Sequence, residues 1–170
     1  MRISIILFFI VFSLSACWPT SVSFTDTGSM PIEWKIFSIS PLENNAPNAP
    51  ISYTANLADE LRDGIQNNTR LKLSSTPNSG EVRIEGNVTN YSITPIALQP
   101  GDNAAKNRLT INANFKIHIL APKEQELTVN CSRFSDYSSD SDLSSVEANL
   151  INEINKQIVQ DVINKLLSNW

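Results

Sequence analysis

The sequence predicts an α+β fold: a two-layer sandwich in which two helices cover a mostly antiparallel or mixed β-sheet of four to five strands. The first observation is that six apolar and six polar residues alternate strictly within 107–120, as in a strand with one buried face. The second is the spacing of three and four between apolar residues in 54–67 and 145–167, which is typical of amphipathic helices. The predicted order is β-α-β-β-β-β-α.

The first predicted strand covers residues 32–39. Trp34 and Ile36 fall on one face of this strand, and Phe37 and Ile39 fall on the other. We therefore expect that both faces of the strand are covered.

A loop and then a helix follow this strand. Three prolines and three asparagines predict a loop over 41–50. The helix is expected to begin near Ser52 or Thr54 and to end near Asn67. Its apolar stripe consists of Leu57, Leu61 and Ile65, widened by Ala58.

Next come a short strand over 71–74, a turn over 76–80 and a long strand over 81–98. The apolar residues of the long strand change from one parity to the other near Asn90, which predicts a β-bulge or bend. Residues 107–120 and 126–134 are separated by a turn and are expected to form a hairpin, with the long strand as its neighbour.

The last predicted element is a helix over 145–167. Ser144 and Glu147 fit the spacing of a capping box at its start. Its broad apolar stripe requires a sheet or a helix to cover it, and consists of Val146, Leu150, Ile151, Ile154, Ile158, Val159, Val162, Ile163, Leu166 and Leu167.

Composition limits the classes of function. The chain of 170 residues fits a single domain, and 41% hydrophobic residues with 18% charged residues are typical of a globular protein. The 13 basic and 17 acidic residues give a net charge of −4, without a basic stripe. Because nucleic-acid binding needs such a stripe, we expect no nucleic-acid partner.

The first 16 residues have the features of a signal peptide. A positive Met1-Arg2 precedes the apolar run 3–12, which is too short to cross a bilayer, since crossing needs about 20 residues. Leu14-Ser15-Ala16-Cys17 resembles the lipobox of bacterial lipoproteins, which predicts cleavage before Cys17 and lipidation of this cysteine. The alternative is an ordinary signal peptide cleaved near Ala16.

This interpretation divides the chain into three parts. Residues 1–16 are the signal peptide, 17–30 a lipidated linker rich in Ser, Thr, Pro and Gly, and 31–170 a single α+β domain. Two or more acyl chains on Cys17 make membrane anchoring stable. The absence of an acidic run after Cys17 favours a domain that faces the periplasm.

The sequence predicts neither catalytic residues nor a metal or cofactor. His118 is the only histidine, and we expect it to be solvated on a polar strand face. The acidic residues Asp136, Asp140 and Asp142 lack the spacing of a calcium loop. Cys131 is expected to be a small buried apolar residue.

The polar side of 107–120 is the most informative surface. It has two interpretations: a solvated sheet face, which is usual for an antiparallel sheet, or a docking surface for a protein or a phosphorylated glycolipid. Its residues are Arg108, Thr110, Asn112, Asn114, Lys116 and His118.

The mature chain resembles the LptE family of lipopolysaccharide-assembly lipoproteins, in its short Bacteroidota form. Four ordered groups of segments carry the resemblance: Ser23-Phe24-Thr25 with Ile32 and Asn44-Asn45-Ala46-Pro47; 86–97; 103–111; and 133–137 with 143–147 and the final Asn169-Trp170.

The resemblance implies a non-enzymatic role in the outer membrane. It implies that the chain plugs and supports a β-barrel of the LptD type, and that lipopolysaccharide is a further candidate partner. The resemblance does not map glycolipid-binding residues onto this chain, so Arg108, Lys116 and Arg133 are candidates from their charge alone. The alternative function is an unrelated periplasmic lipoprotein, either a cell-envelope binding module or a small hydrolase.

Overall fold

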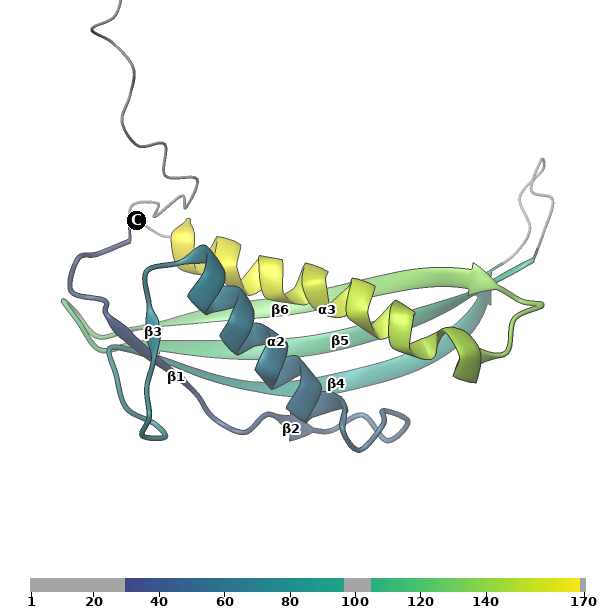
Figure 1. Cartoon of the computed structure of the whole chain (residues 1–170), viewed down its shortest axis with the longest axis horizontal. Helices are drawn as coiled ribbons and strands as arrows, with labels where there is room; N and C mark the ends of the chain where they lie inside the picture. Colours follow the sequence, from purple (N-terminus) through teal and green to yellow (C-terminus); the bar gives the residue numbers. More distant parts are fainter. Residues whose placement is uncertain (1–29, 97–104, 169–170) are drawn as a thin grey trace, which may run out of the picture.

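Three long antiparallel strands form most of the sheet (Figure 1). The computed structural model describes residues 30–96 and 105–168. Strand β4 (Val82–Ile96) pairs with β5 (Lys106–Ile119), which pairs with β6 (Gln125–Ser138). The predicted hairpin, β5 with β6, and the predicted pairing of the long strand β4 beside it are therefore confirmed.

The N-terminal strand is shorter than predicted. β1 (Ile36–Ile39) pairs in parallel with β4 and with β3 (Lys72–Leu73), giving the order β3-β1-β4-β5-β6. The residues before β1 form a turn, in which the backbone N–H of Trp34 donates to the Pro31 carbonyl at 3.1 Å. Ile36 remains 40% exposed, so the prediction that both faces of β1 are covered is wrong at this residue.

A two-residue strand lies within the predicted loop 41–50. β2 (Glu43–Asn44) pairs in parallel with β4, and the Asn45 N–H then donates to the Val88 carbonyl at 2.8 Å. Two residues are too few for a periodic pattern, so backbone pairing alone defines this strand. The predicted class is confirmed: the fold is α+β, with a mixed sheet packed against two helices.

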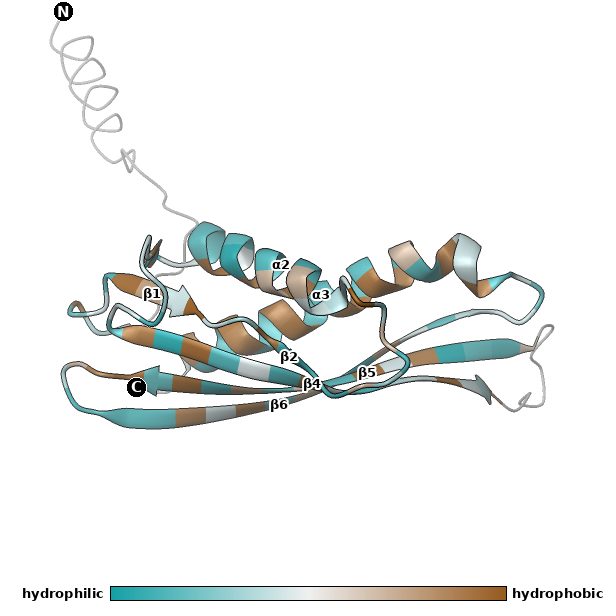
Figure 2. Ribbon diagram, turned by 90° about the horizontal axis from the view of Figure 1, so that it is seen from below, coloured by the Kyte–Doolittle hydropathy of each residue, from teal (hydrophilic) through white to brown (hydrophobic). Residues whose placement is uncertain are grey.

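Helices α2 (Tyr53–Asn68) and α3 (Leu143–Leu167) lie on the same face of the sheet (Figures 1 and 2). They touch at Gly64, where an added Cβ would collide with the Val159 side chain, so the glycine allows this close approach. The predicted apolar stripes form the core with the sheet; fully buried members are Leu57, Leu61, Ile65, Ile154, Ile158, Val162, Ile84, Ile111, Phe115 and Ile117.

A bulge in β4 directs Tyr91 toward the helices. The register with β5 shifts between Val88 and Asn90, which confirms the predicted irregularity. Val88 and Tyr91 are both buried although they are three residues apart, because the extra residue restores the inward side. The Tyr91 hydroxyl then donates a hydrogen bond to Glu147 of α3.

This contact explains why the predicted capping box is wrong. The N-cap of α3 is Asp142, whose carboxylate accepts a hydrogen bond from the Ser144 N–H at 3.3 Å. Glu147 does not reach back to the start of the helix, because it accepts the Tyr91 hydroxyl instead. A tertiary contact has replaced a local one.

Candidate functional site

The uncovered face of the sheet is the candidate functional site. Both helices lie on one side, and no helix in the described residues covers the other side (Figure 2). Alternate residues of β4, β5 and β6 point to this open face, and the strand register aligns them in rows. We define the open face by the rows Glu85–Lys116–Thr128, Asn87–Asn114–Asn130, Asn112–Ser132, Ser92–Thr110–Phe134 and Arg108–Asp136.

Three asparagines form the central row. Asn87, Asn114 and Asn130 lie directly opposite one another on the three strands. Within residues 30–96 and 105–168, none of their side-chain amides has a hydrogen-bond partner. Each amide offers both donors and an acceptor, so the row presents neutral hydrogen-bonding groups to water or to a partner.

This row forms part of the floor of a shallow hollow of about 700 Å³. Glu43, Glu85 and Lys116 are its charged lining residues. The hollow therefore does not concentrate positive charge, and its chemistry suits amide or hydroxyl groups. The remaining lining residues are Ser40, Pro41, Asn78, Gly86, Asn87, Asn114, Phe115, Thr128 and Asn130.

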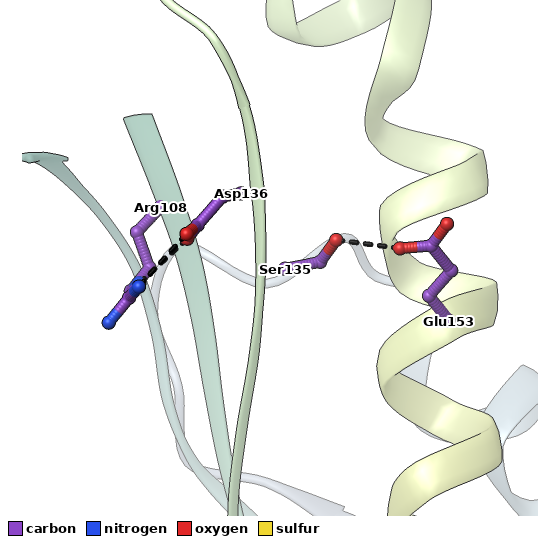
Figure 3. A network of polar contacts seen from close by, with 4 residues as sticks. All are labelled: Arg108, Ser135, Asp136 and Glu153. Carbon is purple, nitrogen blue, oxygen red and sulfur yellow. Dashed lines mark hydrogen bonds and ion pairs between the residues drawn. The ribbon is translucent and has the colours of Figure 1, made fainter. Parts of the chain in front are cut away.

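Arg108 already has a partner on the open face. Its guanidinium forms a two-pronged ion pair with Asp136, with Nε–Oδ1 at 2.7 Å and Nη2–Oδ2 at 2.9 Å (Figure 3). The guanidinium also lies 3.6 Å from the ring centre of Phe134, which is 48% exposed. Hydrogen bonding to Arg108 lowers the pKa of Asp136 from its ordinary value.

Lys116 and His118 lie farther along the same strand. The Lys116 side chain is 62% exposed, and its Nζ is 4.0 Å from Glu126. His118 lies between two carboxylates, with Nδ1 at 3.3 Å from Glu126 and Nε2 at 3.7 Å from Glu85. Of the two candidate binding residues on β5, Arg108 and Lys116, Lys116 has the more exposed side chain.

Arg133 lies on the opposite face. It is opposite the buried Ile111 in the register, and it forms a two-pronged ion pair with Asp161 of α3, one prong being Nε–Oδ2 at 2.7 Å. The structure therefore brings Arg108 and Lys116 to one face and separates Arg133 from them. Next to it Cys131 is buried, as predicted, and burial raises the pKa of its thiol to about 12.

The sequence interpretation missed the acidic and aromatic partners of the candidate cations. Asp136 neutralises the charge of Arg108, and the Phe134 ring stacks against its guanidinium. The Glu126 carboxylate lies 4.0 Å from the Lys116 ammonium group. The alternation of 126–134 contained this signal for Glu126 and Phe134, because a hairpin register places them beside residues of β5. Asp136 lies beyond the predicted end of that strand, which the structure extends to Ser138. Only the exact register, which the sequence did not provide, identifies the pairs.

Other predicted features are outside this face or outside the structure. Cys17, the signal peptide 1–16 and the linker up to residue 29 lie outside the described residues. In the described part of the chain, no three His, Cys, Asp or Glu side chains are grouped to hold a metal ion. None of its helices is long and apolar enough to cross a membrane.

Comparison with known families decides between the alternatives. The family model for LptE, lipopolysaccharide-assembly, matches residues 34–166, which is most of the chain and nearly all of the sheet and helices described above. The chain belongs to the LptE family. It is thus an LptE-family lipoprotein involved in lipopolysaccharide assembly, and this family of outer-membrane lipoproteins is non-enzymatic.

Solved structures share the fold at low sequence identity. A minor lipoprotein from Acinetobacter baumannii has 16% identity and a TM-score of 0.52, over 82% of this chain and 95% of that chain. Uncharacterized lipoprotein B from Nitrosomonas europaea has 13% identity and a TM-score of 0.53, over 89% of this chain and 92% of that chain. No curated protein matches the sequence significantly.

Proposed function

We propose that this chain is anchored to the outer membrane by a lipid on Cys17, faces the periplasm, and plugs and supports an LptD-type β-barrel during lipopolysaccharide assembly. The observation that carries this proposal is the LptE family match over 34–166. The match includes the whole sheet, all of α2 and all but the last residue of α3, so the family relationship concerns the fold as a whole and not an isolated motif.

The chemistry of the open face supports a position inside a barrel. The lumen of an outer-membrane barrel is lined by polar side chains in contact with water. The open face presents amides and hydroxyls, and its arginine is already paired with a carboxylate. Such a surface can exchange hydrogen bonds with a polar wall, and Lys116, the exposed cation of this face, can keep its contact with water in the lumen.

Direct contact with lipopolysaccharide is a separate proposal, with Arg108, Lys116 and Arg133 as its candidate residues. Lys116 is the candidate with the most exposed side chain, and its closest carboxylate is 4.0 Å away. Arg108 and Arg133 would have to give up two-pronged ion pairs before binding a phosphate. An anionic glycolipid would therefore meet Lys116 first.

A pull-down from native membranes in mild detergent tests the main proposal. The full-length tagged chain should retain a large outer-membrane β-barrel, identified by mass spectrometry, and depletion of the chain should lower both assembled barrel and surface lipopolysaccharide. Normal barrel and lipopolysaccharide levels after depletion would contradict the proposal. Retention of cell-wall fragments or another envelope component in place of a barrel would also contradict the proposed barrel partner.

A further inference from the structure

Strand β6 forms a long free edge of the sheet. It is the last strand in the order β3-β1-β4-β5-β6, so among residues 30–96 and 105–168 only one of its sides is paired. Its register with β5 runs without a shift from Gln125 to Ser138, and the strand contains no proline, lysine or glycine. Natural edge strands are usually protected by proline, charged side chains, bulges or short length, because an unprotected edge attracts another strand. In β6 only charged residues could serve this purpose, and two of the three, Arg133 and Asp136, are already paired with Asp161 and Arg108.

The ladder shows which backbone groups are free. The Ser139 N–H donates to the Ala105 carbonyl at 3.1 Å, which identifies odd-numbered residues of β6 as the hydrogen-bonded partners of β5. The even-numbered residues consequently direct their N–H and C=O groups away from the sheet. They are Glu126, Thr128, Asn130, Ser132, Phe134 and Asp136, and no backbone hydrogen bond reaches them from outside β6 within 30–96 and 105–168.

Helix α3 limits what can pair with this edge. It packs over β6, where Glu153 accepts a hydrogen bond from the Ser135 hydroxyl at 2.7 Å and Asp161 pairs with Arg133 (Figure 3 shows the first contact). Paired strands are about 4.8 Å apart, whereas packed helix axes need about 8–10 Å. A second copy joined through β6 would bring its own α3 too close, so the edge suits a strand without a covering helix.

Charge at the edge indicates the composition of that strand. Glu153 is an exposed carboxylate that accepts only a neutral hydroxyl, and no cation among the described residues pairs with it. A lysine or arginine in the added strand beside Ser135 would supply the missing charge. On the open face the same strand would lie beside Thr128, Asn130 and Ser132, which suit polar uncharged side chains.

We propose that β6 accepts an extended, lysine- or arginine-containing segment of the barrel partner by antiparallel strand addition. This inference rests on the proposed function. The segment lies outside the barrel wall, because every strand of a closed wall is already paired on both sides. Main-chain hydrogen bonds supply the affinity of such an added strand, and alternate side chains supply its specificity.

A proline at an outward position tests the inference in the full-length lipoprotein. Ser132→Pro removes one outward N–H and no backbone hydrogen bond to β5. It also removes the hydroxyl that donates to the Asn112 Oδ1 at 2.9 Å, an exposed contact that Ser132→Ala loses as well, so the two variants should differ little in melting temperature. The barrel recovered by mild-detergent pull-down should fall at least ten-fold relative to wild type. Ser132→Ala is the matched control and should retain the barrel. Full recovery with a folded Ser132→Pro variant would overturn the inference.

A second variant keeps the test decisive if proline disturbs the fold. Glu153→Lys reverses an exposed charge and should lower barrel recovery, whereas Asn152→Lys adds the same side chain at the neighbouring exposed position and should not. Equal recovery for both lysine variants would contradict the inference. If wild type itself recovers no barrel, the proposed function fails first. Recovery of an untagged second copy that is lost in Ser132→Pro would also reject the inference.

Discussion

At the scale of single residues, the partners of a charge decide what that charge can do. Arg108 and Arg133 are both candidate cations by their charge, yet one lies on the open face and the other under α3. Both are committed to carboxylates, whereas Lys116 remains largely exposed. Buried polar side chains also have partners: the Tyr53 hydroxyl donates to the Asn155 Oδ1, and the Asn155 Nδ2 donates to the Glu60 carboxylate.

The first prediction concerns this buried chain of hydrogen bonds. Tyr53→Phe removes the hydroxyl and leaves the Asn155 Oδ1, in a residue with no exposed surface, without its donor. We expect the free energy of unfolding to fall by about 1–3 kcal/mol, measured by urea denaturation. Tyr137→Phe, at a partly exposed position, is the control and should change stability by less than about 0.5 kcal/mol. Equal losses would refute the role of the buried bond.

The second prediction concerns acid sensitivity at the open face. The hydrogen bond from Arg108 lowers the pKa of Asp136, so the ionised carboxylate stabilises the folded state above its ordinary pKa of about 4. This contribution is lost as the pH falls below about 4 and through the lowered pKa. Asp136→Asn should therefore lose less stability than wild type between about pH 4 and pH 2. Arg108→Gln should show a similarly reduced acid sensitivity in the same denaturation series.

At the scale of elements, β6 and α3 are the most informative. The alternation of 126–134 predicted one buried and one exposed side for β6, and the structure adds that the strand is an edge. The apolar stripe of α3 predicted a covered helix, and the structure shows that it packs on β6 and against α2. β6 and α3 were predictable because the spacing of apolar residues within each of them, two in the strand and three or four in the helix, indicates its conformation.

The third prediction concerns amide exchange along β6 in the isolated protein. The odd-numbered Leu127, Val129 and Cys131 donate toward β5 and should exchange slowly. The even-numbered Thr128 and Ser132 point outward and should exchange at least ten-fold faster, as measured residue by residue by NMR. Slow exchange at the even positions without a partner would show that another part of the chain covers the edge, and strand addition by the barrel would be rejected.

The fourth prediction tests the stripe of α3. Ile154 and Ile158 have no exposed surface, so Ile154→Asp or Ile158→Asp places an unpaired charge in the core. The cost should exceed about 3 kcal/mol and abolish the cooperative melting transition. Asn152→Asp, at an exposed position of the same helix, should melt like wild type. Normal melting of either isoleucine variant would mean that the stripe is not core.

At the scale of the whole molecule, the domain is asymmetric: helices cover one face of the sheet (Figure 2), and the strand register places rows of polar residues on the other face. This asymmetry suits a protein that works by contact while attached at one end. The proposed attachment belongs to Cys17, outside the described residues.

The fifth prediction concerns this attachment. In native cells, Cys17→Ser should prevent lipidation, and the protein that is not bound to a barrel should move from the membrane fraction to the soluble fraction, because a stable anchor requires the acyl chains. Mass spectrometry of wild-type protein should find the acylated cysteine at its N-terminus. An unmodified Cys17 in protein from native membranes would contradict the anchoring proposal.

The sequence by itself determined the three long strands, both helices, the two-layer class and most of the inward residues, because the period of apolar residues reports local conformation directly. Tertiary structure alone decided which residues meet. Glu147 accepts a hydrogen bond from Tyr91 and takes no part in a capping box, β2 pairs with β4, and Arg108 and Arg133 pair with Asp136 and Asp161. These outcomes depend on register and on long-range partners, and a one-dimensional pattern does not encode the distance between two segments that pair.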